Sequence, residues 1–415
     1  MNPPEITLRC VTCQRSYSPE ALDYTCPACG PLLGTLDVLY DYPSLRKRLS
    51  RETFRRQSRA DHWRYLPLLP VRRPEFILPL QVGWTPLYRA RALEGPWSVG
   101  EIWVKDDGRN PTASFKDRAS SVAVVKAREK GVRAVTAAST GNAASSWSAF
   151  TALAGLETYI FVPENAPRAK VAQLLLYGAR VIQVRGTYDD AFDLCGQAAA
   201  AWGWYNRSTA INPYLGEGKK TGALEICEQL DWQVPDYVFV AVGDGCILQG
   251  TWKGFKDFYE IGLIERLPKL VGVQAEGAAP LTQAWQSGAE RCELLTPRTL
   301  ADSIAVGVPR DQVKALRAVR ESGGQFVAVS DDEILAAMRT LARSVGVFAE
   351  PAGATALAGL KRLAEAGVCG AKTRVVVLVT GNGLKDIEGA MQAATAEPVL
   401  VENSLADVQR RLAEN

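Results

Sequence analysis

The sequence predicts an α/β protein in which two doubly wound parallel sheets follow a small cysteine-rich module. From about residue 76 onward, short apolar and β-branched runs alternate with longer alanine-rich stretches, which is typical of parallel strands joined by crossover helices. Glycine-rich loops follow several of these runs, as expected where ligands bind at the carboxyl ends of parallel strands. The expected strands cover residues 102–105, 134–137, 158–162, 181–184, 237–242, 269–274 and 374–380. The expected helices cover residues 116–130, 142–154, 187–202, 249–262 and 332–345.

Residues 1–40 are expected to form a zinc-ribbon-like module. Two CxxC pairs, Cys10 with Cys13 and Cys26 with Cys29, lie in this segment. Four thiolates at this spacing are the usual ligands of a structural Zn²⁺ ion. Because four ligands close the coordination shell, the site is expected to stabilise the fold and not to activate a water molecule.

Residues 41–75 are interpreted as an arginine-rich helical linker. Its basic residues are Arg46, Lys47, Arg48, Arg51, Arg55, Arg56 and Arg59. A solvated helix face or a subunit contact is favoured over an RNA-binding arm. Nucleic acid is an unlikely partner, since the net charge of the whole chain is only +3. Residues 76–415 are expected to form the catalytic region, with a smaller α/β subdomain at about residues 113–205 inserted in the larger one.

Composition narrows the chemistry that the chain can perform. No run of about 18 apolar residues is present and the first residues do not resemble a signal peptide, so a cytoplasmic location without membrane association is expected. His62 is the only histidine, and its polar, arginine-rich surroundings suggest a surface position. A Ser-His-Asp triad or a multi-histidine metal site is therefore excluded away from this residue. Acid–base chemistry must come from other side chains or from a cofactor.

A lysine at the start of an expected helix is the strongest candidate for catalysis. Lys116 follows an extended segment that contains a proline, and Ser114 is positioned to cap the first turn. Lysine normally avoids the positive end of the helix dipole. An amine held there should have a lowered pKa and become nucleophilic, although a solvated surface lysine fits the local pattern equally well.

Three other loops are expected at strand ends. The residues Ser139, Thr140, Gly141 and Asn142 open an alanine-rich helix, where backbone N–H groups are suited to a carboxylate. The run Gly243-Asp244-Gly245-Cys246-Ile247 precedes another helix, and its two glycines allow a phosphate to approach the backbone.

The last loop begins at Thr380, whose hydroxyl can face a neutral ring nitrogen. Asp244 is compatible with a phosphate only if its side chain points away or caps the helix. A reactive lysine, a phosphate cradle, a carboxylate cradle and a partner for a ring nitrogen together indicate pyridoxal phosphate holding an amino-acid substrate.

From the cysteine pairs to roughly residue 392, the chain resembles the threonine synthase family of fold-type II pyridoxal-phosphate enzymes. The matching runs are 110–117, 139–142, 212–213 with 217–221, 273–280, 350–354 and 380–386. The resemblance implies that Lys116 bonds to the cofactor and moves protons, and that Asn142 bonds the cofactor's 3-hydroxyl group. It further implies that residues 243–247 hold the cofactor phosphate, that Thr380 faces the pyridine nitrogen, and that the enzyme is a homodimer.

The family's reaction converts O-phospho-L-homoserine and water to L-threonine and phosphate. Many members carry Thr, Ser, Arg and Asn for the substrate phosphate where this chain has Ala143, Ala210, Leu215 and Asp244. A buried dianion without a cation is costly, and the candidate replacements are Lys219, Lys220, Arg207 and Arg168. A threonine or serine dehydratase, or a β-replacement synthase, is the alternative, because these enzymes need the same cofactor loops but no second phosphate site.

Overall fold

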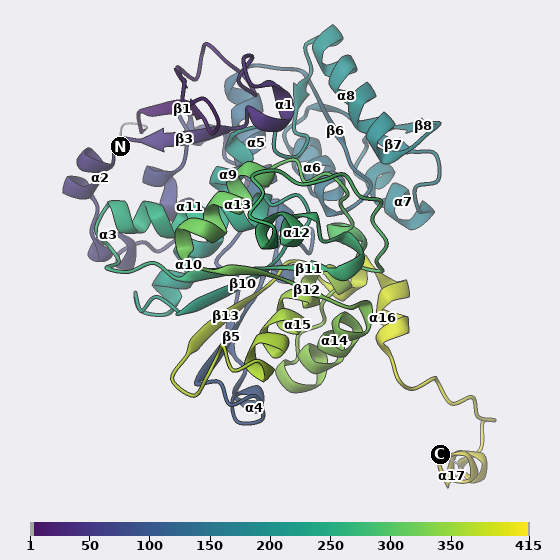
Figure 1. The fold of residues 1–415 in the computed structure, drawn as a ribbon. Helices are drawn as coiled ribbons and strands as arrows, with labels where there is room; N and C mark the ends of the chain where they lie inside the picture. Colours follow the sequence, from purple (N-terminus) through teal and green to yellow (C-terminus); the bar gives the residue numbers. More distant parts are fainter. Residues whose placement is uncertain (1–3, 414–415) are drawn as a thin grey trace.

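The computed structural model describes residues 4–413 and arranges them around three sheets (Figure 1). The N-terminal sheet is antiparallel and has the order β2-β1-β3. Its strands are β1 (Ile6–Cys10), β2 (Ser16–Tyr17) and β3 (Leu36–Tyr40). They lie on the outside of the molecule, at the upper left of Figure 1, and their buried residues pack into the core cluster of the large sheet.

The large sheet has the strand order β12-β11-β10-β13-β5-β4. All neighbours are parallel except β4 and β5, which are antiparallel. The strands are β4 (Leu87–Arg89), β5 (Glu101–Asp106), β10 (Tyr237–Ala241), β11 (Lys269–Ala275), β12 (Gln325–Val329) and β13 (Arg374–Val379). Sequence reasoning missed β4 and β12, which are the short strands at the two edges and are only partly buried.

Apolar residues alternate between the two faces of the large sheet. Val238 and Val240 of β10 pack in one core cluster, and Phe239 packs in a second cluster on the opposite face. Successive side chains of a strand point to opposite faces, so a strand covered on both sides must be apolar throughout. The continuous apolar runs in the sequence therefore indicated correctly that helices cover both faces.

The smaller sheet is wholly parallel, with the order β8-β7-β6-β9. Its strands are β6 (Ala134–Ala138), β7 (Glu157–Pro163), β8 (Arg180–Val184) and β9 (Tyr205–Asn206). The helices α6 (Asn142–Leu153), α7 (Arg168–Leu176) and α8 (Tyr188–Trp202) belong to the same part of the chain, at the upper right of Figure 1. The two sheets confirm an α/β architecture, while the boundaries at residues 40, 75, 113 and 205 stay predictions.

The remaining helices, except the last one, lie around the sheets (Figure 1). The short N-terminal helices are α1 (Gly30–Leu33), α2 (Tyr42–Arg48), α3 (Arg51–Arg55) and α4 (Arg91–Glu94). The others are α5 (Lys116–Glu129), α9 (Tyr214–Lys219), α10 (Thr221–Gln229), α11 (Cys246–Glu260), α12 (Pro280–Gln286), α13 (Gln312–Ser322), α14 (Asp331–Val345), α15 (Pro351–Glu365), α16 (Ile387–Ala393) and α17 (Leu405–Ala413). Within residues 4–413, every helix is too short or too polar to span a bilayer.

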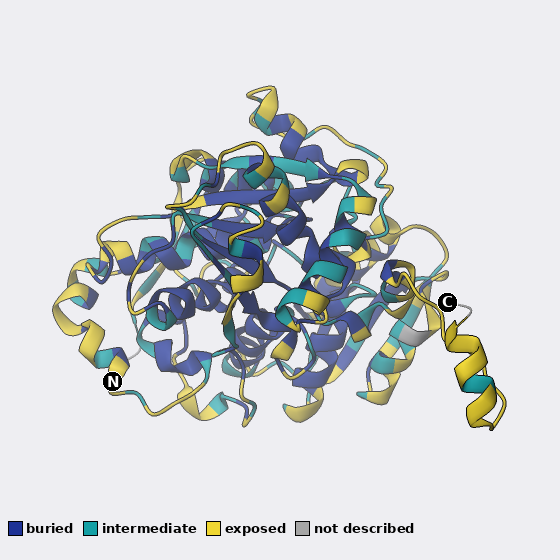
Figure 2. Ribbon diagram, turned by 90° about the horizontal axis from the view of Figure 1, so that it is seen from below, coloured by how far each residue is buried: buried dark blue, intermediate teal, exposed yellow. Residues whose placement is uncertain are grey.

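Burial is greatest in the strands and in the helices next to them, whereas α17 is almost wholly exposed and lies apart from the body (Figure 2). His62 contradicts the sequence-based expectation of a surface position, since it is completely buried. Its Nε2 atom shares a hydrogen bond of 3.0 Å with the Ser121 hydroxyl. Burial, followed by the charge of Arg118, lowers the pKa of His62 to about 3, so the imidazole is neutral. The polar neighbours of His62 in sequence gave no hint that α5 and α10 would cover it.

Candidate active site

The loop before α5 is joined to the loop after β13. The Phe115 N–H group donates a hydrogen bond of 2.9 Å to the carbonyl oxygen of Thr380, and the Asn382 N–H group donates one of 3.0 Å to Ala113. Ala113 has a φ of +63°, in the left-handed region that non-glycine residues rarely adopt. These contacts fix Lys116, the first residue of α5, beside the carboxyl end of β13.

Ser114 caps the helix less directly than the sequence suggested. The N-cap position is occupied by Phe115, whose side chain cannot cap. The Ser114 hydroxyl accepts only a long hydrogen bond of 3.4 Å from the Lys116 N–H group. The start of α5 is therefore held mainly by the backbone contacts to the Thr380 loop.

The Lys116 amine meets the electrostatic requirement for a nucleophile. Its side chain is partly exposed to a cavity but lies deep inside the protein. This burial, followed by the positive charges of Lys219 and Arg207, lowers the pKa of Lys116 to about 8. The sequence also predicted a lowered pKa for Lys116, but from the helix dipole. In the structure, the main causes are desolvation and the neighbouring cations.

One cavity of about 690 Å³ contains every residue that the sequence indicated for the cofactor and the substrate. These residues are Lys116, Ser139, Thr140, Gly141, Asn142, Gly243, Asp244, Gly245, Cys246, Ile247 and Thr380. They come from the carboxyl ends of β6, β10 and β13 and from the start of α5. Parallel strands explain this convergence, because their carboxyl ends meet at the same edge of each sheet.

The loop after β10 has the form of a phosphate cradle. Gly245 has a φ of +92°, and a Cβ atom there would lie 2.6 Å from the Ala315 side chain. Glycine is therefore required, and α11 begins directly afterwards with its N–H groups free to meet an anion. The Asp244 carboxylate accepts a hydrogen bond of 3.1 Å from the Arg310 N–H group. Cys246 is buried, which raises its thiol pKa.

Asn142 and Thr380 both line the cavity. The Asn142 amide donates a hydrogen bond of 2.8 Å to the Glu350 carboxylate, and this bond fixes the orientation of the amide. Glu350 was not assigned a role from the sequence, because an acid before the proline of an ordinary helix gives no signal of its own. Burial raises the pKa of Glu350 to about 7, although Asn142 and Lys116 oppose this effect.

Two of the four candidate cations line the cavity. Arg207 and Lys219 do so, and both are nearly fully buried. Lys220 does not, since its amine lies 2.6 Å from both the Glu217 and the Asp257 carboxylates. Arg168 is exposed and lies outside the cavity wall.

A second cavity of about 410 Å³ shares Thr140, Gly141 and Asn142 with the first. Lys385 lies in its wall and donates hydrogen bonds of 3.0 Å to Ser145 and to Gln173. Because these partners belong to α6 and α7, Lys385 ties the loop after β13 to the smaller sheet.

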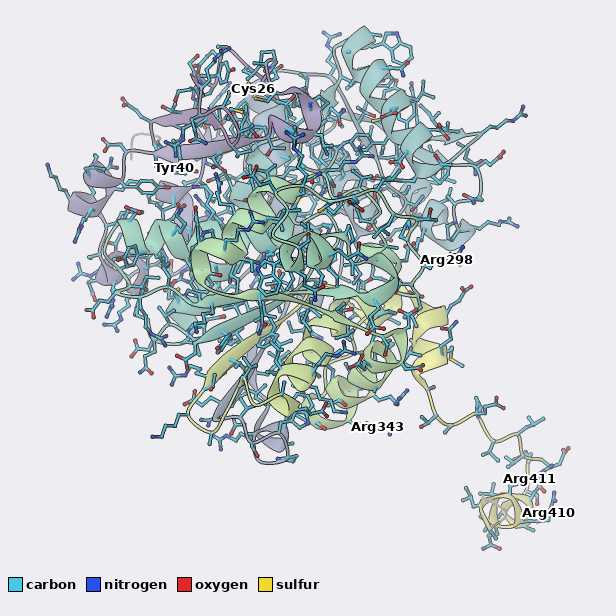
Figure 3. The ribbon with its side chains drawn as sticks, viewed as in Figure 1. Cys26, Tyr40, Arg298, Arg343, Arg410 and Arg411 are labelled. Atoms are coloured by element: carbon cyan, nitrogen blue, oxygen red, sulfur yellow. The ribbon has the colours of Figure 1, made fainter. Side chains whose placement is uncertain are left out.

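The four cysteines of the N-terminal segment form a compact cluster, with all four sulfur atoms within 4.8 Å of one another. The sulfur atoms of Cys13 and Cys26 are 3.7 Å apart. A tetrahedron with zinc–sulfur bonds of 2.3 Å has sulfur–sulfur edges of about 3.8 Å. The cluster therefore has the ligands and the size for one zinc ion. Figure 3 shows Cys26 and Tyr40 in this segment, and the Tyr40 hydroxyl donates a hydrogen bond of 2.5 Å to Glu217 of α9.

Comparison with known proteins agrees with this geometry. Residues 78–381 match the family described as pyridoxal-phosphate dependent enzyme. Among solved structures, the processed threonine deaminase isoform 2 of Solanum lycopersicum has a TM-score of 0.62 and 23% identity, covering 75% of this chain and 87% of that chain. Maize serine racemase has a TM-score of 0.63 and 21% identity, covering 74% and 91%. These likenesses show the fold, that of the fold-type II pyridoxal-phosphate enzymes.

Two relatives match almost the whole chain. The threonine synthase of Methanocaldococcus jannaschii is 43% identical over 408 residues, which is 98% of this chain and 99% of the relative. The threonine synthase of Methanosarcina acetivorans is 39% identical over 407 residues, covering 98% of both. The chain therefore belongs to the threonine synthase family.

The residues present fit pyridoxal phosphate. No hydrogen-bond partner of the Lys116 amine occurs among residues 4–413, so the amine is free for a covalent bond to an aldehyde. The glycine loop at the start of α11 provides the cradle that a phosphate needs. Lys116 and the two buried cations Arg207 and Lys219 line the same cavity, which suits a ligand with phosphate groups.

Proposed function

We propose that this chain is a threonine synthase that converts O-phospho-L-homoserine and water to L-threonine and phosphate with pyridoxal phosphate as cofactor. The observation that carries the proposal is the Lys116 amine, with its lowered pKa, in the same cavity as a phosphate cradle and two further buried cations. The identity to threonine synthases over nearly the full chain supports it.

Each loop of the cavity has a role in this proposal. Lys116 bonds to the cofactor, residues 243–247 hold its phosphate, and Thr380 faces its pyridine nitrogen. Asn142, oriented by Glu350, bonds its 3-hydroxyl group. Residues 139–142 also receive the substrate carboxylate at the start of α6. When bound, the cofactor withdraws electrons from the substrate Cα and so makes its C–H bond acidic.

The reaction needs proton transfers at adjacent carbon atoms, and Lys116 is placed to perform them. The Cγ–O bond breaks and releases phosphate, Cγ gains a proton to become the methyl group, and water supplies the hydroxyl group at Cβ. An amine whose pKa is about 8 can accept and return protons near neutral pH. No histidine is available in the cavity for this task, since His62 is buried elsewhere.

The test is an assay of the cofactor-loaded protein with O-phospho-L-homoserine, in which phosphate and L-threonine are measured together. Equal release of both is expected. Lys116→Ala should abolish turnover and the absorbance of the lysine-bound cofactor, whereas the control Lys361→Ala, at an exposed position on α15, should change neither. Release of a 2-oxo acid and ammonia from threonine or serine, without threonine formation, would identify the protein as a dehydratase.

We also propose that the cysteine cluster binds one structural zinc ion and that the enzyme is a cytoplasmic homodimer. The four clustered sulfur atoms support the metal, and the resemblance to the family supports the dimer. Metal analysis of the purified protein tests the zinc site, and the mass of the protein in solution tests the dimer.

A further inference from the structure

Arg207 is a buried cation whose hydrogen-bonding groups are largely unused. Its side chain is 2% exposed, yet it has no ion-pair partner among residues 4–413. Its only hydrogen bond to a described side chain is a long one of 3.4 Å from Nη2 to the Ser120 hydroxyl. The Nε–H group is buried without any partner. Burial of a cation with unmet donors is costly unless an anion completes the site.

The position of Arg207 associates it with the substrate side of the cavity. It follows β9 directly, and its N–H group donates a hydrogen bond of 2.9 Å to Thr136 of β6. The strand β6 leads into the loop 139–142, which is suited to the substrate carboxylate. Ser120, the partner of the guanidinium group, lies one turn after Lys116 on the same face of α5. The Arg207 side chain therefore reaches from the smaller sheet to α5, the helix that begins with the reactive amine.

Lys219 enters the cavity from a different direction. It lies at the end of α9, and a Cβ atom at Gly250 would be 2.8 Å from the Lys219 Cβ atom. Gly250 belongs to α11, which starts at the cofactor-phosphate cradle. The two cations thus approach from two sides, with Lys219 next to the helix of the cradle and Arg207 next to the smaller sheet.

We propose that Arg207 binds the phosphate group of the substrate and so determines specificity for a phosphorylated amino acid. This inference rests on the proposed function. Leu215, where many family members carry an arginine, is buried in the core of the smaller sheet and outside the cavity wall. The planar guanidinium group offers parallel donors that match phosphate oxygens. Arg207 therefore supplies from β9 the positive charge that position 215 lacks.

Arg207→Gln removes the charge and shortens the side chain, but it keeps an amide donor. We expect the KM for O-phospho-L-homoserine to rise about 10- to 100-fold, the loss typical of a hydrogen bond to a charged group. The affinity of the cofactor-loaded protein for inorganic phosphate, measured by calorimetry, should fall by a similar factor. The affinity for L-threonine, which has the carboxylate but no phosphate, and the absorbance of the bound cofactor should stay unchanged.

Three further variants make the test specific. Arg207→Lys keeps the charge and should give intermediate values, and it replaces the glutamine variant if that variant does not load cofactor. Arg168→Gln, at an exposed position outside the cavity, should leave phosphate affinity unchanged. Lys219→Gln should weaken cofactor binding more than phosphate binding.

Two results would overturn the assignment. Equal losses toward L-threonine and phosphate would mean that Arg207 binds the α-carboxylate. Phosphate binding that survives in Arg207→Gln but is lost in Lys219→Gln would give the role to Lys219. Phosphate binding can be measured without turnover. Loss of phosphate affinity in Arg207→Gln would therefore support the site even if the unaltered protein formed no threonine. Failure of the unaltered protein to form threonine would refute the proposed reaction, but not the phosphate site.

Discussion

Glu225 is the centre of a buried charge network, and substitution of Glu225 gives the sharpest stability prediction. Its carboxylate lies 2.5 Å from Nη1 of Arg118 and 2.7 Å from the Lys105 amine. Asp107 completes the network, with a carboxylate oxygen 2.6 Å from Nε of Arg118. All four side chains are fully buried. The positive charges of Lys105 and Arg118 are thus balanced by the negative charges of Asp107 and Glu225. The network is close to the reactive lysine in sequence, since Arg118 lies two residues after Lys116.

Glu225→Gln keeps the shape of the side chain and removes one charge. Burial opposes ionisation of Glu225, but the charges of Arg118 and Lys105 outweigh it and hold its pKa well below the usual range. The variant would leave one uncompensated buried positive charge, and breaking a buried pair in this way costs about 3–5 kcal/mol. Because the folded pKa is depressed, the contribution of Glu225 is fully present at neutral pH and is lost only in strong acid.

The free energy of unfolding can be measured by urea titration, with hydrogen exchange of α5 and α10 as a local readout. The matched control is Glu52→Gln, which breaks the exposed pair with Arg56 and should cost less than about 1 kcal/mol. Faster exchange in α5 should accompany the loss of stability in Glu225→Gln. Equal effects of the two substitutions would refute the view that burial makes this network important.

Two other predictions concern the metal and pH. Cys26→Ser should lower the zinc content well below one ion per chain. Hydrogen exchange should become faster in β3, where the Leu36 carbonyl accepts a 2.7 Å hydrogen bond from Lys314. An unchanged zinc content would contradict the assignment of the cluster. In the cofactor-free protein, the pKa of Glu350 is about 7 against an unfolded value near 4.5, so its contribution is fully present below pH 4.5 and is lost as pH rises through 7. This loss amounts to about 3 kcal/mol at pH 8. In Glu350→Gln, the free energy of unfolding, measured by urea titration from pH 5 to 8, should not show this decline.

The α/β class and the four loops could be read from the sequence because each depends on local pattern. An apolar run followed by glycines at a strand end is recognisable within ten residues, and parallel strands necessarily bring such ends together. Lys116, the run 243–247 and Thr380 therefore meet in one cavity, as predicted. The cysteine cluster was predictable for the same reason, since its spacing lies within one short segment.

Only the tertiary structure decided which charged groups face the cavity. Lys219 and Lys220 are neighbours in sequence, yet one lines the cavity and the other is held by two carboxylates on α9 and α11. His62 was expected at the surface but is covered by helices far away in the sequence. The direction of a side chain depends on packing between distant segments, which local pattern does not contain. The sequence by itself thus determined the family and the chemistry of the loops, whereas packing between distant segments assigned Arg207 and Glu350 to the site.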